Sequence, residues 1–152
     1  MTTGKEDTID MLSTGELGFL VSAVRSSIWS AIETELNPLD ITTAQFVVLN
    51  SIALGKGRTI GEFCRLLDYD SGAMTRLLDR IERKGLIRRV PNPEDRRSYL
   101  IEFTPESKAV FPKAKRRVES VFRRLLAGFS NAQAEALKRS LEQVLSNATA
   151  IR

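Results

Sequence analysis

The spacing of apolar residues along the chain predicts a mainly helical protein. Between residues 17 and 36, apolar side chains recur at three- and four-residue steps, which is the period of an amphipathic helix. This helix is expected to end at Asn37-Pro38, because a residue before proline is pushed out of the helical conformation. A second helix is predicted from Thr42 to about Gly55, since Gln45 stands three residues after Thr42, as in a capping box.

Two short helices are predicted next, separated by a brief connector. Thr59 and Glu62 repeat the capping pattern and open a helix that runs to Leu67. Asp70 or Ser71 can cap the following helix, whose apolar residues have helical spacing and which ends at Gly85. Two helices joined by so short a turn are typical of a helix-turn-helix.

After Gly85 the apolar period changes from helical to alternating. Residues 86–90 and 99–103 are predicted to form a hairpin around the loop NPEDRRS at 92–98, with Pro91 counted among the turn residues. Thr104-Pro105 then opens a long helix, and Ser130 with Gln133 opens the last one. The predicted fold is mainly α with a small β-hairpin wing, a winged helix-turn-helix flanked by N- and C-terminal helices.

Length and composition are consistent with one soluble globular domain. The chain has 152 residues, of which 42% are hydrophobic, so it can bury a core. It lacks the run of about 20 apolar residues that a membrane span needs. The N-terminus, MTTGKEDTID, does not have the pattern of a secretory signal, and a single cysteine cannot form an internal disulfide. We expect a cytoplasmic protein without a membrane partner.

The residue types argue against an enzyme. The chain contains no histidine, which is the commonest general base and the commonest zinc ligand. Serine–histidine and cysteine–histidine catalysis are thereby excluded within one chain, and no glycine-rich phosphate loop is present. We expect no catalytic residues, no metal site and no cofactor.

The net charge of +4 is modest, so a prediction of nucleic-acid binding depends on where the positive residues lie along the chain. On the predicted helix 71–83, Arg76 and Arg80 stand one turn apart on the polar face. Small residues near its start allow close approach to a DNA groove, where one arginine can read a base edge while the other holds a phosphate. These small residues are Ser71, Ala73 and Thr75. The alternative is a solvated charged face on a core helix.

The loop 92–98 carries more charge than solubility requires. Arg96 and Arg97 offer planar donors to phosphate or to the negative potential of a narrow minor groove. Asp95 would weaken a purely electrostatic patch. Its predicted role is therefore to orient an arginine through a side-chain hydrogen bond.

These residues carry a resemblance to the MarR family of bacterial winged-helix transcription regulators. The run from Asp70 to Phe111 resembles the core of that family, above all in the wing Asp95-Arg96-Arg97-Ser98 after Gly85-Leu86-Ile87. The upstream ITTAQFVVL at 41–49 resembles the second helix of the family. One departure is FTPES at 103–107, where the family usually has Leu-Thr and a glycine further on.

The resemblance implies a homodimer that binds double-stranded DNA and most often represses transcription. The expected organisation is a single domain over 1–152, with a winged helix-turn-helix at 42–104 and a helical dimerisation region at 10–37 and 105–152. Two-fold symmetry would match a pseudo-palindromic operator. Arg96 would then enter the minor groove, while Arg89 and Arg97 would hold the DNA backbone.

Relatives in this family often release DNA on binding small aromatic or phenolic effectors. Arg25, Trp29 and Phe46 are candidates for such a site, although aromatic residues at helical spacing are more often core. Cys64 is either a redox switch or a small buried residue, and its place in the helix 59–67 favours burial.

Two alternatives concern binding surfaces. The basic residues between 113 and 124 would either touch the flanks of a DNA site or form a solvated helix face, and the second is favoured. A winged helix can also act as a protein-interaction module without a DNA target, but such a module has no use for a protruding Asp-Arg-Arg tip.

Overall fold

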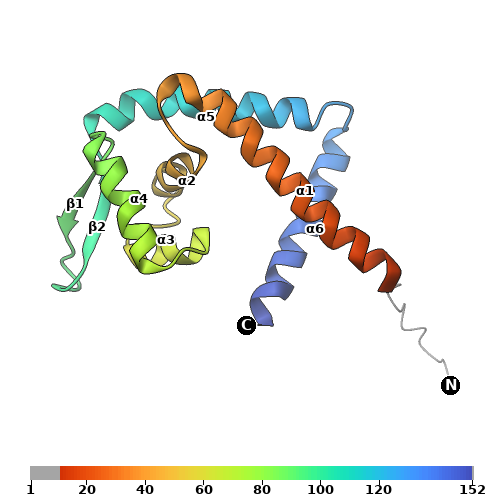
Figure 1. Ribbon diagram of the computed structural model, residues 1–152, viewed down its shortest axis with the longest axis horizontal. Helices are drawn as coiled ribbons and strands as arrows, with labels where there is room; N and C mark the ends of the chain where they lie inside the picture. Colours follow the sequence, from red (N-terminus) through yellow and green to blue (C-terminus); the bar gives the residue numbers. More distant parts are fainter. Residues whose placement is uncertain (1–10, 152) are drawn as a thin grey trace. The chain divides into compact units, whose positions relative to one another are not determined.

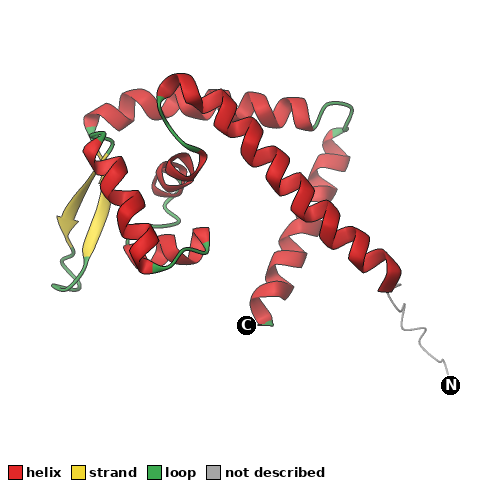
Figure 2. Ribbon diagram, viewed as in Figure 1, coloured by secondary structure: helices red, strands yellow, loops and turns green. Residues whose placement is uncertain are grey.

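The computed structural model describes residues 11–151 and is mainly helical, with one two-stranded hairpin, which confirms the predicted fold class (Figure 2). The described residues form two compact units, one ending at Val118 and the other beginning at Glu119. The elements in chain order are α1 (Met11–Leu36), a 3-10 turn (Asn37–Leu39), α2 (Thr43–Ala53), α3 (Ile60–Leu67), α4 (Ser71–Arg83), β1 (Ile87–Pro91), β2 (Tyr99–Phe103), α5 (Pro105–Leu125) and α6 (Asn131–Ala150) (Figure 1).

The predicted helix starts are confirmed at the level of individual hydrogen bonds. Thr42, Thr59 and Ser130 each form a complete capping box at the start of α2, α3 and α6. Of the two candidate caps for α4, Asp70 is the one used, and its Oδ1 accepts the N–H of Ala73 at 2.8 Å. Each cap satisfies donors that the first helical turn leaves without partners.

The core of the first unit gathers residues from every element of the winged module. Leu36 of α1, Leu49 of α2 and Phe63 of α3 are fully buried. They share the core with Met74, Leu77, Leu78 and Ile81 of α4 and with Ile87 and Ile101 of the hairpin. Burial of one such side chain stabilises the fold by about 1.5–3 kcal/mol. Because four residues of α4 are held in this way, the rotation of the helix about its axis is fixed, and so is the face that it presents to solvent.

The hairpin differs from its prediction by one residue. β1 and β2 pair antiparallel from Ile87↔Phe103 to Pro91↔Tyr99, so the first strand is 87–91 rather than 86–90. Leu86 is excluded because its N–H bonds to the carbonyl of Ile81 and completes the end of α4 beside Gly85, whose φ is +72°. Pro91 belongs to the strand and not to the turn, which is tolerated because each strand of a two-stranded sheet is an edge.

The second unit contains the end of α5, a turn at Gly128 and helix α6. None of the described residues of α6 is buried, and apolar side chains at Leu137, Leu141, Val144 and Leu145 are between 41% and 68% exposed. Across residues 11–151, no helix is apolar over enough of its length to cross a membrane.

Candidate nucleic-acid interface

The outward face of α4 carries two arginines without partners. Arg76 and Arg80 are exposed, and within residues 11–151 neither guanidinium forms a hydrogen bond or an ion pair. Ser71 at the start of the helix is exposed as well, whereas Ala73 and Thr75 are half-buried. The structure thus brings the five predicted α4 residues onto one helix whose opposite face lies in the core.

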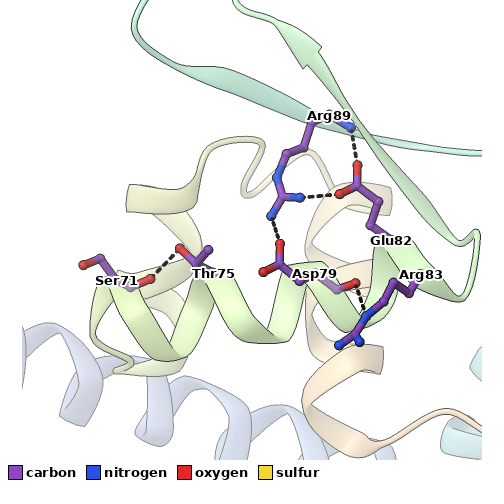
Figure 3. A network of polar contacts seen from close by, with 6 residues as sticks. All are labelled: Ser71, Thr75, Asp79, Glu82, Arg83 and Arg89. Carbon is purple, nitrogen blue, oxygen red and sulfur yellow. Dashed lines mark hydrogen bonds and ion pairs between the residues drawn. The ribbon is translucent and has the colours of Figure 1, made fainter.

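Local geometry determines how these side chains lie. The Thr75 hydroxyl donates to the carbonyl of Ser71 at 2.7 Å, so it points back to its own helix (Figure 3). A Cβ at Gly72 would lie 3.4 Å from Nη1 of Arg76 and 3.2 Å from Oδ1 of Asp70. The glycine therefore leaves room for the Arg76 guanidinium beside the first turn of α4.

The wing tip is held by hydrogen bonds within its own loop. Asn92 donates its N–H to the Ser98 carbonyl at 3.2 Å and its side-chain amide to the Ser98 hydroxyl at 2.9 Å. The N–H of Ser98 bonds to the Asp95 carbonyl at 3.0 Å. Arg96 and Arg97 are exposed, and their guanidinium groups meet no acceptor in the described part of the chain.

Asp95 has a different contact from the one predicted. Its Oδ1 accepts the backbone N–H of Arg97 at 2.9 Å instead of a guanidinium. An aspartate commonly bonds to the backbone two residues on in this way, because its short side chain reaches that amide directly. The carboxylate thus shapes the turn that presents both arginines and leaves their side chains unpaired.

The second departure concerns Arg89, which was predicted to hold the DNA backbone. Its guanidinium lies between two carboxylates of α4, at 2.7 Å from Oδ1 of Asp79 and in an ion pair with Glu82 (Figure 3). The side chain is only 21% exposed. Arg89 therefore links the wing to α4 through ion pairs with two carboxylates.

Further polar contacts attach the hairpin to the module and involve residues that had no predicted role. Glu102 of β2 forms ion pairs with Arg58 at 3.3 Å and with Arg88 at 3.2 Å. The carbonyl of Arg58 also accepts the N–H of Ile101 at 2.7 Å. Next to these contacts, the backbone N–H groups of Arg58 and Thr59 hold the pKa of Glu62 below its ordinary value. No local sequence signal marks the Arg58–Glu102 pair, because its partners are 44 residues apart along the chain.

The effector candidates are not alike. Phe46 is buried and stacks on Phe111, with ring centroids 5.9 Å apart, so it belongs to the core. Trp29 is half-buried on α1, and the guanidinium carbon of Arg25 lies 5.4 Å from the centre of its ring.

Cys64 is half-buried, and the described residues contain no cluster of metal-ligand side chains.

Comparison with known proteins places this geometry in a family. The family model described as "MarR family" matches residues 39–98. The multiple antibiotic resistance protein MarR of Salmonella typhimurium is 41% identical over 101 residues, which are 66% of this chain and 70% of that protein. The protein of the same name from Escherichia coli is 35% identical over 130 residues, or 85% of this chain and 90% of that one.

The chain belongs to the MarR family. A more distant relative, an HTH-type transcriptional repressor of Mycobacterium tuberculosis, is 27% identical over 86% of this MarR-family chain and 94% of its own length. Among solved structures, a mutant MarR from Escherichia coli complexed with operator DNA superposes with a TM-score of 0.77 at 32% identity, covering 91% of this chain and 99% of that one. The resemblance seen in the wing and in α4 is thereby confirmed. The relatives are transcriptional regulators, so this MarR-family chain is a regulator and not an enzyme.

Proposed function

We propose that this regulator represses transcription by binding a pseudo-palindromic operator as a homodimer. The observation that carries the proposal is the set of four unpaired, exposed arginines in the winged module, Arg76, Arg80, Arg96 and Arg97. Arginines without carboxylate partners keep all their donors for base edges and phosphates. The buried face of α4 and the hydrogen-bonded turn of the wing hold them on ordered backbone.

The two arginine pairs suit different parts of a duplex. Helix α4 presents small residues and Arg76 and Arg80, a pattern that suits a helix lying in the major groove. The narrow wing tip presents Arg96 for a minor groove and Arg97 for the adjacent backbone. Asp95 supports both wing residues by its hydrogen bond to the backbone N–H of Arg97, and not by contact with either guanidinium.

Exposed apolar side chains support the homodimer. In the first unit, Leu17, Leu20, Val21 and Val24 of α1 are 46–57% exposed. In the second unit, α6 exposes four apolar residues and buries none. Exposed apolar side chains that repeat along a helix indicate a surface that binds another protein. The commonest such partner is a second copy of the same chain. A DNA target inside the cell also agrees with the predicted cytoplasmic location.

Release by a small aromatic or phenolic effector remains part of the proposal. Trp29 and Arg25 are the candidates that the structure leaves accessible, since Phe46 lies in the core. A ligand that shifts the equilibrium toward a non-binding arrangement must bind that arrangement more tightly. Titration of aromatic acids into the protein–DNA complex, compared between the wild type and Trp29→Ala, tests this step.

The DNA-binding proposal is tested by titrating the protein into a labelled duplex taken from upstream of its own gene and measuring fluorescence anisotropy. Arg96→Ala and Arg76→Ala should each weaken binding, and Arg116→Ala is the matched control. Arg116 is also exposed and unpaired among the described residues, but it lies on α5. Equal losses in all three variants, or no binding by the wild type at low salt, would contradict the proposal.

A further inference from the structure

A cavity of about 620 Å³ lies between the N-terminal turn of α2 and the C-terminal half of α4. Five of the seven residues that line it have polar or cationic side chains. The residues are Thr42, Ala44 and Gln45 on one side and Leu77, Arg80, Arg83 and Lys84 on the other. Of these, only Arg80 was singled out as a DNA contact by the pattern of the sequence. We propose that this cavity, called here the α2–α4 basin, binds a phosphate of the DNA backbone.

Donors converge on the α2–α4 basin from both sides. Arg80 has no partner within residues 11–151, and Arg83 uses only its Nε, at 3.4 Å from the Asp79 carbonyl. On the α2 side, the N–H of Thr43 bonds to Glu33 and that of Gln45 bonds to Thr42. In the described structure the N–H of Ala44, between them, meets no acceptor, although Ala44 lines the cavity. An anion there would receive a main-chain donor together with arginine side chains.

Lys84 supplies a third cation, which is at present shared with a neighbouring acid. Its Nζ forms an ion pair with Oδ2 of Asp40 at 3.3 Å and donates to Oε1 of Gln45 at 3.1 Å and to the carbonyl of Asp40. The Asp40 side chain is 91% exposed. Asp40 therefore opposes an anion in the basin and competes with it for Lys84.

The cations of the lining favour an anion, and their place beside the outward face of α4 favours a phosphodiester of bound DNA. Leu77 is the one large apolar residue in it, and that side chain is itself 1% exposed. Thr42, Arg80 and Arg83 are exposed residues at the edge of the basin. Arg80 also belongs to the face of α4 proposed to enter the major groove, so a backbone phosphate next to that groove lies within its reach.

This inference rests on the proposed function, and charge substitutions at one position test it. Ala44→Glu places a carboxylate in the basin, and this new acid lies in the first turn of α2, where acids favour a helix. It should weaken binding to a selected duplex by about tenfold or more and lower the salt slope by about one unit per protomer. Ala44→Gln has the same size without the charge and should lose less than about threefold. Thermal unfolding of each variant checks that the fold is kept.

A second variant is expected to have the opposite effect on DNA affinity. Asp40 has a φ of 52°, a conformation that asparagine also tolerates, so Asp40→Asn should fold normally. Because it removes the negative charge that is paired with Lys84, it should tighten DNA binding by about threefold or more at low salt. This variant decides the question even if Ala44→Glu fails to fold.

The possible results separate the basin from the general proposal. If the wild type binds duplex DNA while Ala44→Glu and Asp40→Asn both match it, the basin assignment is overturned and the proposed function stands. Absence of any binding by the wild type would instead defeat the proposed function. Calorimetric titration of the protein with inorganic phosphate is a further test of the basin. Binding that Ala44→Glu abolishes without any change in DNA affinity would assign the basin to a free anion and overturn the DNA contact.

Discussion

Replacement of Arg89 tests whether this residue links the wing to α4 or holds DNA. The guanidinium is 21% exposed and bridges two carboxylates that are 47% and 37% exposed on Asp79 and Glu82. A charge-assisted hydrogen bond contributes about 1.5–3 kcal/mol when well buried, and partial exposure reduces that value. We therefore expect Arg89→Met to lower the free energy of unfolding by about 2 kcal/mol for the two contacts together.

A loss of this size is easily measured. In a chain of 152 residues, about 2 kcal/mol corresponds to a fall of roughly 4–8 °C in Tm, compared at equal protein concentration because a dimer would be concentration-dependent. Arg89→Lys keeps the positive charge but cannot form the planar bridge to two carboxylates, so it should lose most of the same stability.

DNA affinity then separates the two roles of Arg89. If Arg89 only links the wing to α4, Arg89→Met should weaken DNA binding without changing its salt slope, because no phosphate contact is lost. A phosphate contact predicts a slope lower by about one unit per protomer in Arg89→Met and little loss in Arg89→Lys. Wild-type stability in Arg89→Met, or a restored complex in Arg89→Lys, would refute the reasoning from the ion pairs.

Three further predictions concern other parts of the chain. Thr59→Ala should lower the free energy of unfolding by about 1 kcal/mol in urea titrations, because it removes the N-cap of α3; a loss below about 0.3 kcal/mol would count against the cap. The pKa of Glu62 is lowered in the folded state, so its carboxylate stabilises the fold above the ordinary carboxyl pKa, and this stabilisation is lost as the pH falls below that value. Glu62→Gln should therefore flatten the acid side of a plot of unfolding free energy against pH. An unchanged slope would contradict this linkage. Leu141→Glu, at a side chain that is 52% exposed, should leave the helical circular-dichroism signal intact but halve the mass measured by light scattering, whereas a variant of unchanged mass would show that α6 is not in the dimer interface.

The elements could be predicted because their signals are local. Thr42, Thr59 and Ser130 each stand three residues before a glutamine or glutamate, and the capping boxes follow from that spacing alone. The positions of Arg76 and Arg80 on the outer face of α4 follow from the spacing of four buried residues. The limits of the first strand were wrong by one residue because the N–H of Leu86 is used by the end of α4, a contact that an alternating pattern does not reveal, whereas those of the second strand were right.

The roles of single charged residues were harder to predict because they depend on tertiary partners. Arg89 looks like any other wing arginine in the sequence, and only the approach of β1 to α4 brings it against Asp79 and Glu82. The donors of the α2–α4 basin are about 40 residues apart along the chain, so no motif unites them. Asp95 was expected at a guanidinium, but the backbone amide two residues on is nearer.

Selection of bound duplexes from a random pool tests the central claim most directly. The account predicts enrichment of an inverted repeat whose half-site centres lie about one helical turn, or roughly 10 base pairs, apart, as two symmetric copies of α4 require. It also predicts that Arg76→Ala and Arg96→Ala relax the preference at different positions of each half-site. A pool that shows no enrichment, or a single asymmetric site bound by one chain, would contradict it.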